Sequence, residues 1–339
     1  MRFLALLLLA LAWQPDAAQD APSSALGLIT HCDQNATLAL RSDSQNADSL
    51  WPPARAGHAM AYDAPRGMVM VYGGDADALM WGWDGTHWHE AGGAMPNPGR
   101  RKHMKLVYDA ARARLLMFGG ATRAATLGDT WEWDGHQWAR VATDGPAARA
   151  GYAMAYDPVR RHVVLFGGAD SSGAAKSDTW EWDGSWTKVA DDGPDARKFA
   201  EMAFDVASNQ LVLVGGIPSG NGRIFRDAWG LSPNGWRKLQ EQNMGRALGA
   251  LSRDPASGDL LWIGGRSDSA ANGDALRRTS TGWIAVPAAP IPERFTHDAA
   301  LDTKRNRVVV FGGSGLGGDL ADLWEWDGRR WTHIEGPAR

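Results

Sequence analysis

Six arginines recur along the chain at intervals of 46–49 residues, and a guanidinium is well suited to bind a carboxylate through two parallel hydrogen bonds. The six are Arg55, Arg101, Arg149, Arg197, Arg246 and Arg294. If they line one opening of the fold, they would attract a ligand that carries a carboxylate, and all six are candidate binding residues. The alternative is an arginine–aspartate latch between loops or repeats, and the regular recurrence of the arginine favours that structural role.

A second position carries a charge in every other repeat. Four residues after the arginine, three repeats have alanine, whereas the second, fourth and sixth have Lys105, Glu201 and Asp298. A charged side chain on an inner strand is unfavourable unless it is paired or solvated, so these three either contact a ligand or pair with one another. His58 and His297, one position earlier in the first and sixth repeats, are further candidates. The alternative for both is a neutral histidine held by a local hydrogen bond.

The sequence offers no clear motif for a metal or a cofactor. His87 and His89 share one face of a predicted strand, but no third residue stands at metal-ligand spacing. We recognise neither a nucleophile–base pair nor a phosphate-binding loop. We therefore expect no cofactor and no catalysis, and Glu201 is the base that an enzyme would use.

A Gly-Gly pair lies 18 residues after each arginine, and the loop that follows it varies most among the repeats. The loop of the fourth repeat, residues 217–226, is the longest. It carries Arg223, Phe225 and Arg226, and it is our first choice for a contact surface because loops on a rigid scaffold often hold binding residues. The alternative is a mobile surface loop.

The elements that position these residues are four predicted β-strands in each repeat. The first strand alternates, as in residues 58–62, and ends at an aspartate eight residues after the arginine. The second is continuously apolar, as in residues 163–166, which is typical of a strand covered on both faces. The third and fourth form a tryptophan-rich hairpin with Asp-Gly at its turn, seen at residues 129–138, 178–186 and 322–331.

A lone hairpin is marginally stable in water, so the copies must pack against one another. Six such units predict an all-β fold, a six-bladed β-propeller with four antiparallel strands per blade over residues 51–339. Two repeats depart from the pattern: the fifth has Asp274 followed by alanine and leucine, and the first has Leu79 where the hairpin aspartate is expected. Because each repeat supplies its own four strands, the sequence leaves open how the ring closes.

An apolar strand, a Gly-Gly pair, an aromatic strand and a tryptophan follow one another in each unit, and this order resembles the Kelch repeats of galactose-oxidase-like propellers. The resemblance implies a Kelch-type propeller, a fold that hosts binding modules as well as enzymes. The copper-radical site of galactose oxidase is not implied, because it needs a cysteine and the only cysteine, Cys32, precedes the repeats. A bacterial sialic-acid epimerase (mutarotase) is also an exported Kelch propeller, which keeps that activity open by resemblance.

Residues 1–18 resemble a secretory signal peptide, with Arg2, an apolar stretch too short to span a bilayer, and Ala17-Ala18 as a cleavage site. Residues 19–50 are polar and predict a flexible N-terminal lead-in. We therefore expect a periplasmic or secreted protein without a membrane span after signal removal. A net charge of −4 and the lack of a basic run argue against nucleic acid.

We expect a monomer whose loop face binds a protein, peptide or glycan without catalysis. The alternative is an epimerase or mutarotase that acts on a sugar acid in a central funnel, with arginines holding the carboxylate.

Overall fold

The computed structural model describes residues 50–93, 95–220, 222–239, 244–279, 282–286 and 291–337. Within these ranges β-strands are the only regular secondary structure, and no helix is long and apolar enough to cross a membrane. The predicted signal peptide and all of the lead-in except Leu50 lie outside the described residues.

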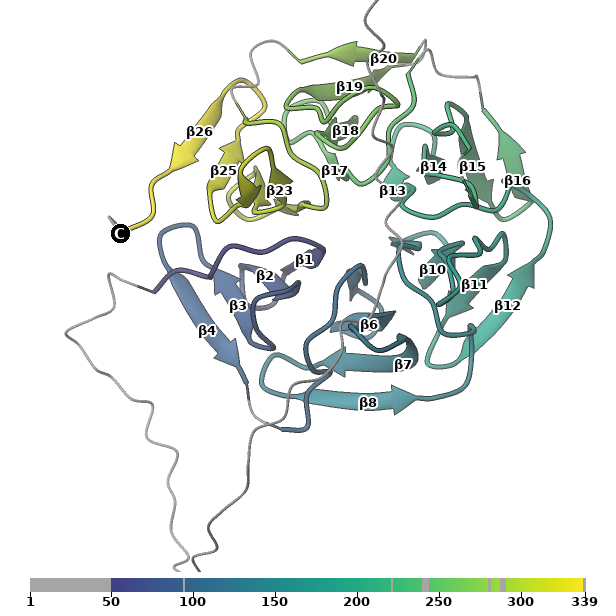
Figure 1. The fold of residues 1–339 in the computed structure, drawn as a ribbon, viewed down its shortest axis with the longest axis horizontal. Helices are drawn as coiled ribbons and strands as arrows, with labels where there is room; N and C mark the ends of the chain where they lie inside the picture. Colours follow the sequence, from purple (N-terminus) through teal and green to yellow (C-terminus); the bar gives the residue numbers. More distant parts are fainter. Residues whose placement is uncertain are drawn as a thin grey trace, which may run out of the picture. The chain divides into compact units, whose positions relative to one another are not determined.

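Six four-stranded antiparallel sheets surround a central axis, as Figure 1 shows. The sequence prediction of a six-bladed β-propeller is therefore confirmed. The first three blades are formed by β1 (His58–Asp63), β2 (Met68–Gly73), β3 (Met80–Trp83) and β4 (Trp88–Gly92); β5 (Leu106–Asp109), β6 (Arg114–Ala121), β7 (Thr126–Trp133) and β8 (Trp138–Ala142); β9 (Ala153–Asp157), β10 (His162–Phe166), β11 (Thr179–Trp182) and β12 (Trp186–Ala190).

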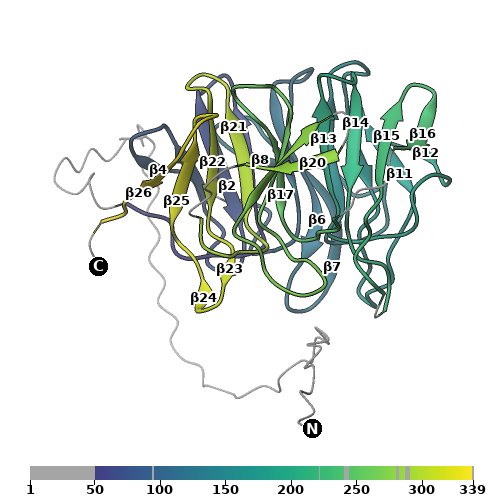
Figure 2. The same ribbon diagram turned by 90° about the horizontal axis from the view of Figure 1, so that it is seen from above.

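The second half of the ring repeats this plan. Blades four to six are formed by β13 (Glu201–Asp205), β14 (Gln210–Val214), β15 (Ala228–Ser232) and β16 (Gly235–Lys238); β17 (Ala250–Arg253), β18 (Leu260–Ile263), β19 (Ala275–Thr279) and β20 (Gly282–Ala285); β21 (Asp298–Asp302), β22 (Arg307–Phe311), β25 (Leu323–Trp326) and β26 (Trp331–Ile334). Blade six also carries a small hairpin, β23 (Ser314–Gly315) and β24 (Gly318–Asp319), which projects from one face of the ring (Figure 2).

The turns follow from the residues that the sequence places there. Asp157 ends β9, and its Oδ1 accepts hydrogen bonds from the N–H groups of Val159 and Arg160. In the hairpin of blade two, Asp134 Oδ1 accepts the N–H groups of His136 and Gln137, while Gly135 adopts a φ of +98°. The Asp-Gly signal therefore marks the hairpin turns, as predicted.

The core lies between neighbouring blades. The second strands are fully buried, as in β10, where Val163, Val164 and Leu165 are 0% exposed. In the hairpins of blades one, two, three and six, two tryptophans face one another, and the rings of Trp133 and Trp138 are 5.6 Å apart. This burial on both faces explains why the second strands are continuously apolar.

A ring of backbone hydrogen bonds closes the propeller around its axis. It joins the six residues that lie two positions after the repeated arginines. We call these six residues the axial ring. The bonds run from N–H to carbonyl as His103 to Gly57 (2.7 Å), Gly151 to His103 (2.7 Å), Phe199 to Gly151 (2.6 Å), Leu248 to Phe199 (3.2 Å), Thr296 to Leu248 (2.7 Å) and Gly57 to Thr296 (2.7 Å). All six residues have a φ between +54° and +69°, a backbone conformation that is unfavourable for the four that are not glycine. The hydrogen bonds that close the ring offset this conformational strain.

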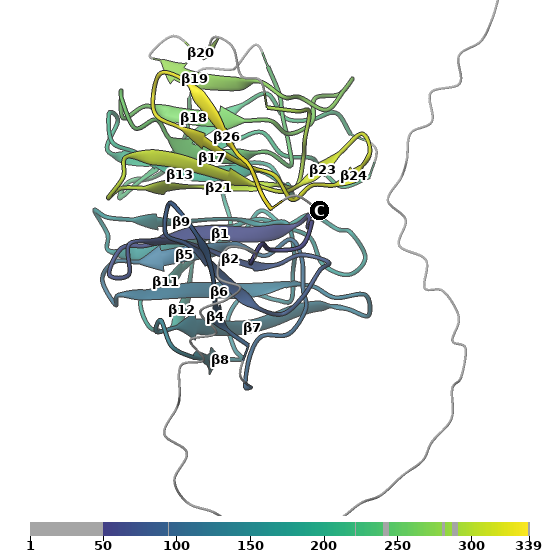
Figure 3. The same ribbon diagram turned by 90° about the vertical axis from the view of Figure 1, so that its left-hand side faces the viewer.

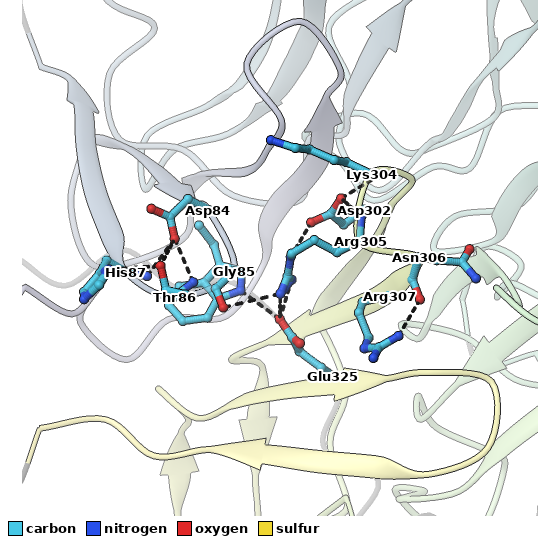
Figure 4. A network of polar contacts seen from close by, with 11 residues as sticks. Asp84, Gly85, Thr86, His87, Asp302, Lys304, Arg305, Asn306, Arg307 and Glu325 are labelled. Carbon is cyan, nitrogen blue, oxygen red and sulfur yellow. Dashed lines mark hydrogen bonds and ion pairs between the residues drawn. The ribbon is translucent and has the colours of Figure 1, made fainter.

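Side chains also join the last blade to the first. Strands β1 and β21 lie side by side (Figure 3). On the rim of the face opposite the Gly-Gly turns, Arg305 of blade six donates to Asp302 Oδ2 at 2.7 Å, to Glu325 Oε1 at 2.8 Å and to the Gly85 carbonyl of blade one at 3.4 Å (Figure 4). Trp83 of blade one donates to the same Glu325 oxygen at 2.9 Å. Among the described residues, each four-stranded sheet is formed by strands of a single repeat, so no strand is exchanged between blades there.

Gly215, the first glycine of the pair in blade four, permits a direct test of the blade contact. Its φ is +64°, and an added Cβ would overlap the carbonyl oxygen of Arg246 in blade five. We expect Gly215→Ala to lower the free energy of unfolding by ~3 kcal/mol or more, because strain and overlap add. Gly235→Ala is the matched control, since its φ is +93° and no atom lies within 4 Å, so strain alone should cost about 1 kcal/mol. If urea denaturation shows that the two variants lose the same free energy of unfolding, the predicted steric overlap at Gly215 is contradicted.

Candidate functional site

Each repeated arginine is buried and paired with an aspartate of its own blade. Nη1 of every guanidinium also donates to the carbonyl of the first glycine of the Gly-Gly pair, as Arg149 does to Gly167 at 3.0 Å. The six ion pairs are Arg55–Asp77 (2.8 Å), Arg101–Asp129 (2.7 Å), Arg149–Asp178 (2.5 Å), Arg197–Asp227 (2.6 Å), Arg246–Asp274 (2.7 Å) and Arg294–Asp322 (2.6 Å). This is the geometry of the latch.

The aspartate in the latch is held by a tryptophan as well. Arg149 donates Nη1 to Asp178 Oδ1 and Nη2 to Asp178 Oδ2, and the Trp180 indole N–H donates to the same Oδ2 at 2.7 Å. Burial raises the pKa of the Asp178 carboxyl, but the hydrogen bonds from Arg149 and Trp180 outweigh burial and hold the pKa below its usual value. Since Arg149 also donates Nε to the Ala147 carbonyl, little of its hydrogen-bonding capacity is left for a ligand. We therefore leave the six arginines out of the proposed contact surface.

The latch of blade one corrects a sequence expectation. The absence of an aspartate at Leu79 indicated that this hairpin lacks the acidic residue. Asp77, two residues earlier, takes the role instead: it accepts from Arg55 at 2.8 Å and from the Trp81 indole at 3.3 Å. Sequence reasoning missed Asp77 because the loop before β3 places the carboxylate at a different spacing.

The three charges of alternate blades meet on the axis. Lys105 Nζ lies 2.8 Å from Glu201 Oε2 and 3.6 Å from Asp298 Oδ1, and all three side chains are largely buried. Asp298 also accepts the N–H groups of Met60 at 2.9 Å and Ala299 at 3.0 Å. Of the two alternatives, pairing across the axis is the arrangement that the structure shows, and we call these three residues the axial triad.

Electrostatics inside the triad differ from one group to the next. Burial raises the pKa of Glu201 to about 7, although Lys105 opposes this shift. Burial lowers the pKa of the Lys105 ammonium, but attraction to Asp298 and Glu201 outweighs burial and holds it above its usual value. At neutral pH Lys105 is therefore charged, and Glu201 exchanges its proton near pH 7.

The two candidate histidines are buried beside the latches. The His58 ring lies next to the Gly312 turn of blade six, and the His297 ring lies next to the Gly264 turn of blade five. Burial and the nearby charge of Arg55 lower the pKa of His58 to about 3, and burial with Arg294 lowers that of His297. Both imidazoles are neutral at pH 7, as the structural alternative expects. Their buried ring nitrogens, however, have no hydrogen-bond partner of normal geometry among the described residues, so the local hydrogen bond of that alternative is not seen.

A small cavity lies on the axis above the triad. It is lined by the axial ring, by the six residues that follow the ring residues, and by Lys105 and Glu201. Its volume is about 40 Å³, which is close to the space of one water molecule. Glu201, His58 and His297 do line it, as an enzyme in the central funnel would require, but the cavity lacks both a free guanidinium and the room for a sugar acid.

The loop of blade four is held by both neighbouring blades. Ser219 Oγ accepts the Ala175 N–H of blade three at 2.8 Å, and the Ile224 N–H donates to Asp268 of blade five at 3.0 Å. The Phe225 ring lies 3.9 Å from the Arg197 guanidinium carbon and covers that latch, while its side chain remains partly exposed. Arg223 is exposed, and Arg226 lies 3.8 Å from an Asp268 carboxylate oxygen.

No group of three or more histidine, cysteine, aspartate or glutamate side chains that could hold a metal ion occurs in the described part of the chain. Of the two histidines considered for a metal, His89 lies 2.7 Å from Asp84 Oδ2.

Fold and site together define a β-propeller of six four-stranded blades whose axis is closed by a backbone ring and filled by an ion triad. No family model matches the chain, and no curated protein matches it. Among solved structures 524 chains match, and one of them, "Structure of YjhT", superposes with a TM-score of 0.67 over 85% of this chain and 99% of that chain at 14% identity. At this identity the likeness concerns the fold alone and supports the six-bladed propeller.

Proposed function

We propose that the chain is an exported Kelch-type propeller that binds a protein, peptide or glycan through the face bearing the Gly-Gly turns, without catalysing a reaction. The observation that carries this proposal is the state of the axis, where Lys105, Glu201 and Asp298 pair with one another and leave a cavity of about 40 Å³. Ligand sites for small molecules are usually several times larger. The recurring Gly-Gly turns and hairpins support the Kelch assignment, and the composition of residues 1–18 supports export.

The structured loops support the choice of face. The bonds from Ala175 to Ser219 and from Ile224 to Asp268 tie the loops of blades three, four and five into one surface. A rigid surface loses little conformational entropy on binding, which favours recognition of a large partner. The opposite face presents short turns, such as residues 327–330.

A single-cysteine experiment tests which face binds. With Cys32 replaced by serine, Ser171→Cys places a thiol on the loop face and Arg329→Cys places one on the opposite face, since both residues are exposed. Each thiol is coupled to a polyethylene glycol chain, and binding to arrays of peptides and glycans is measured. We expect the conjugate at position 171 to lose binding and that at position 329 to retain it. Binding that survives both conjugates would refute the loop-face assignment.

The second candidate function is an epimerase or mutarotase for a sugar acid, with Glu201 as the base. It is favoured by the pKa of Glu201, because a general base works best with a pKa near the operating pH. A melting-temperature screen against sugar acids, neutral glycans and peptides separates the candidates, since a ligand that binds the native state stabilises it. Stabilisation by sugar acids, with turnover that Glu201→Gln abolishes, would establish the enzyme and overturn the binding module.

Glu201 also makes stability depend on pH. Its pKa rises from 4.5 in an unperturbed carboxyl to about 7 in the fold, so the folded state binds the proton more tightly than the unfolded state. This group therefore stabilises the fold less as the pH rises from 4.5 to 7, by roughly 3 kcal/mol in total. We expect Glu201→Gln to gain stability relative to the wild type over that window. Buried histidines with lowered pKa act in the opposite direction, so the measured quantity is the difference between variant and wild type. A difference that is constant with pH would contradict the prediction.

A further inference from the structure

Five cations on the loop face have no carboxylate partner among the described residues: Arg100, Arg123, Lys198, Arg223 and Arg266. Three of them, Lys198, Arg223 and Arg266, lie on the neighbouring blades four and five, and we call these three the cationic patch. Two lysines of this face are paired, Lys102 with Asp75 at 3.1 Å and Lys176 with Asp170 at 2.5 Å. Arg223 and Arg266 are exposed and Lys198 is partly exposed.

The backbone fixes how the patch is arranged. Lys198 pairs with Ile217, where the loop of blade four begins, and its Nζ lies 3.8 Å from the place of a Cβ on Gly173 in blade three. Arg266 begins the loop of blade five, and Asp268, two residues later, holds the blade-four loop at Ile224. Lys198 and Arg266 therefore flank the loop that carries Arg223, and the three positive charges follow one arc of the surface.

Apolar side chains lie beside this arc. The Arg266 guanidinium carbon is 5.4 Å from the centre of the Phe295 ring. Phe199 and Leu248 are consecutive members of the axial ring, and both are partly exposed, as is Phe295. A ligand that lies along the arc would meet cations at intervals and apolar surface toward the axis.

Resting on the proposed loop-face function, we propose that the cationic patch binds an acidic peptide segment of a partner protein, with carboxylates at Lys198, Arg223 and Arg266 and an apolar side chain against Phe295 and Leu248. Arginine forks hold carboxylates by charge-assisted hydrogen bonds, and opposite charge steers the partner to this arc. A small free acid would reach one cation on a shallow surface and gain too few contacts to bind tightly. An acidic glycan offers carboxylates but no apolar side chain for the axial end of the patch.

The test is selection of a displayed random peptide library on the immobilised full chain, followed by titration of the selected peptides. We expect sequences with aspartate or glutamate next to an apolar residue. Lys198→Glu with Arg266→Glu should weaken their binding at least ~100-fold, and added salt should weaken binding to the wild type. Arg329→Glu with Arg330→Glu, on the exposed turn of the opposite face, is the charge-matched control and should leave binding within about 2-fold. All three side chains of the patch are on the surface, so melting temperatures of the variants check that folding is intact.

The outcomes separate this proposal from the function on which it rests. Two results would overturn the acidic-peptide proposal and leave the loop-face function standing. In the first, the selected peptides are not acidic. In the second, the conjugate at position 171 blocks their binding, but the charge reversals at Lys198 and Arg266 leave it intact. Binding of acidic glycans alone would overturn it in the same way. Peptide binding that the conjugate at position 171 does not affect would overturn both.

Discussion

Arg149→Ala is expected to lower the free energy of unfolding by about 3–5 kcal/mol, because it leaves a largely buried carboxylate without its cation. Asp178, at 16% exposure, would lose both guanidinium hydrogen bonds and keep only that from Trp180. The carbonyls of Gly167 and Ala147 would lose their donors as well. Thermal and urea denaturation measure the loss, and a large drop is expected for a latch that holds blade three.

Two further variants make this prediction specific. Arg246→Ala should cost less, because its partner Asp274 is 48% exposed and can be solvated by water. Arg330→Ala, with a side chain 82% exposed, should change stability by less than about 0.5 kcal/mol. If Arg149→Ala unfolds like the wild type but alters binding of carboxylate ligands, the arginines form a funnel and the latch interpretation fails.

Lys105→Met is expected to have a comparable effect, through the axis and not through a latch. It removes the only cation near Glu201 and Asp298 in the triad, so two buried carboxylates remain. We expect a loss of about 3–5 kcal/mol at pH 8. The loss should shrink at pH 5, because burial already raises the pKa of Glu201 to about 7 and removal of the ammonium raises it further, so the carboxyl takes up a proton and loses its charge.

The double variant Lys105→Met with Glu201→Gln tests whether the two residues act as a pair. It should be more stable at pH 8 than Lys105→Met alone, and the cycle should show a coupling of about 1–3 kcal/mol. Additive effects would contradict the pairing, since residues that do not interact change stability independently. In that case Lys105 and Glu201 would be available to a ligand, and the enzyme alternative would gain support.

Several features of the fold and the site could be predicted from the chain because they are local and repeated. The four strands, the Asp-Gly hairpin turn and the buried second strand depend on residue types a few positions apart. The arginine–aspartate latch is of the same kind: Arg149 and Asp178 belong to one repeat, and five other repeats carry the same pair. Comparison between repeats therefore served the purpose of an alignment.

Other features were out of reach because they join different blades. The charged position in alternate repeats marked Lys105 as a candidate, but only the diameter of the ring decides that its ammonium reaches Glu201, 96 residues away. The sequence marked Phe225 as a contact residue of the blade-four loop, but it did not show that the ring also lies against the Arg197 guanidinium. Lys198 and Arg266 were not among the expected site residues, because only the structure shows that neither has an ion-pair partner among the described residues.

The sequence by itself determined the number of blades, the strands within each and the residues that hold each blade together, because strand periodicity, turn chemistry and short-range ion pairs act over a few tens of residues. Only the tertiary structure decided how the ring closes, which charges cancel on its axis and which remain on its surface. The axial ring from Gly57 to Thr296 shows the reason: its six hydrogen bonds depend on where six separate chain segments lie around one axis, and no stretch of sequence contains that arrangement.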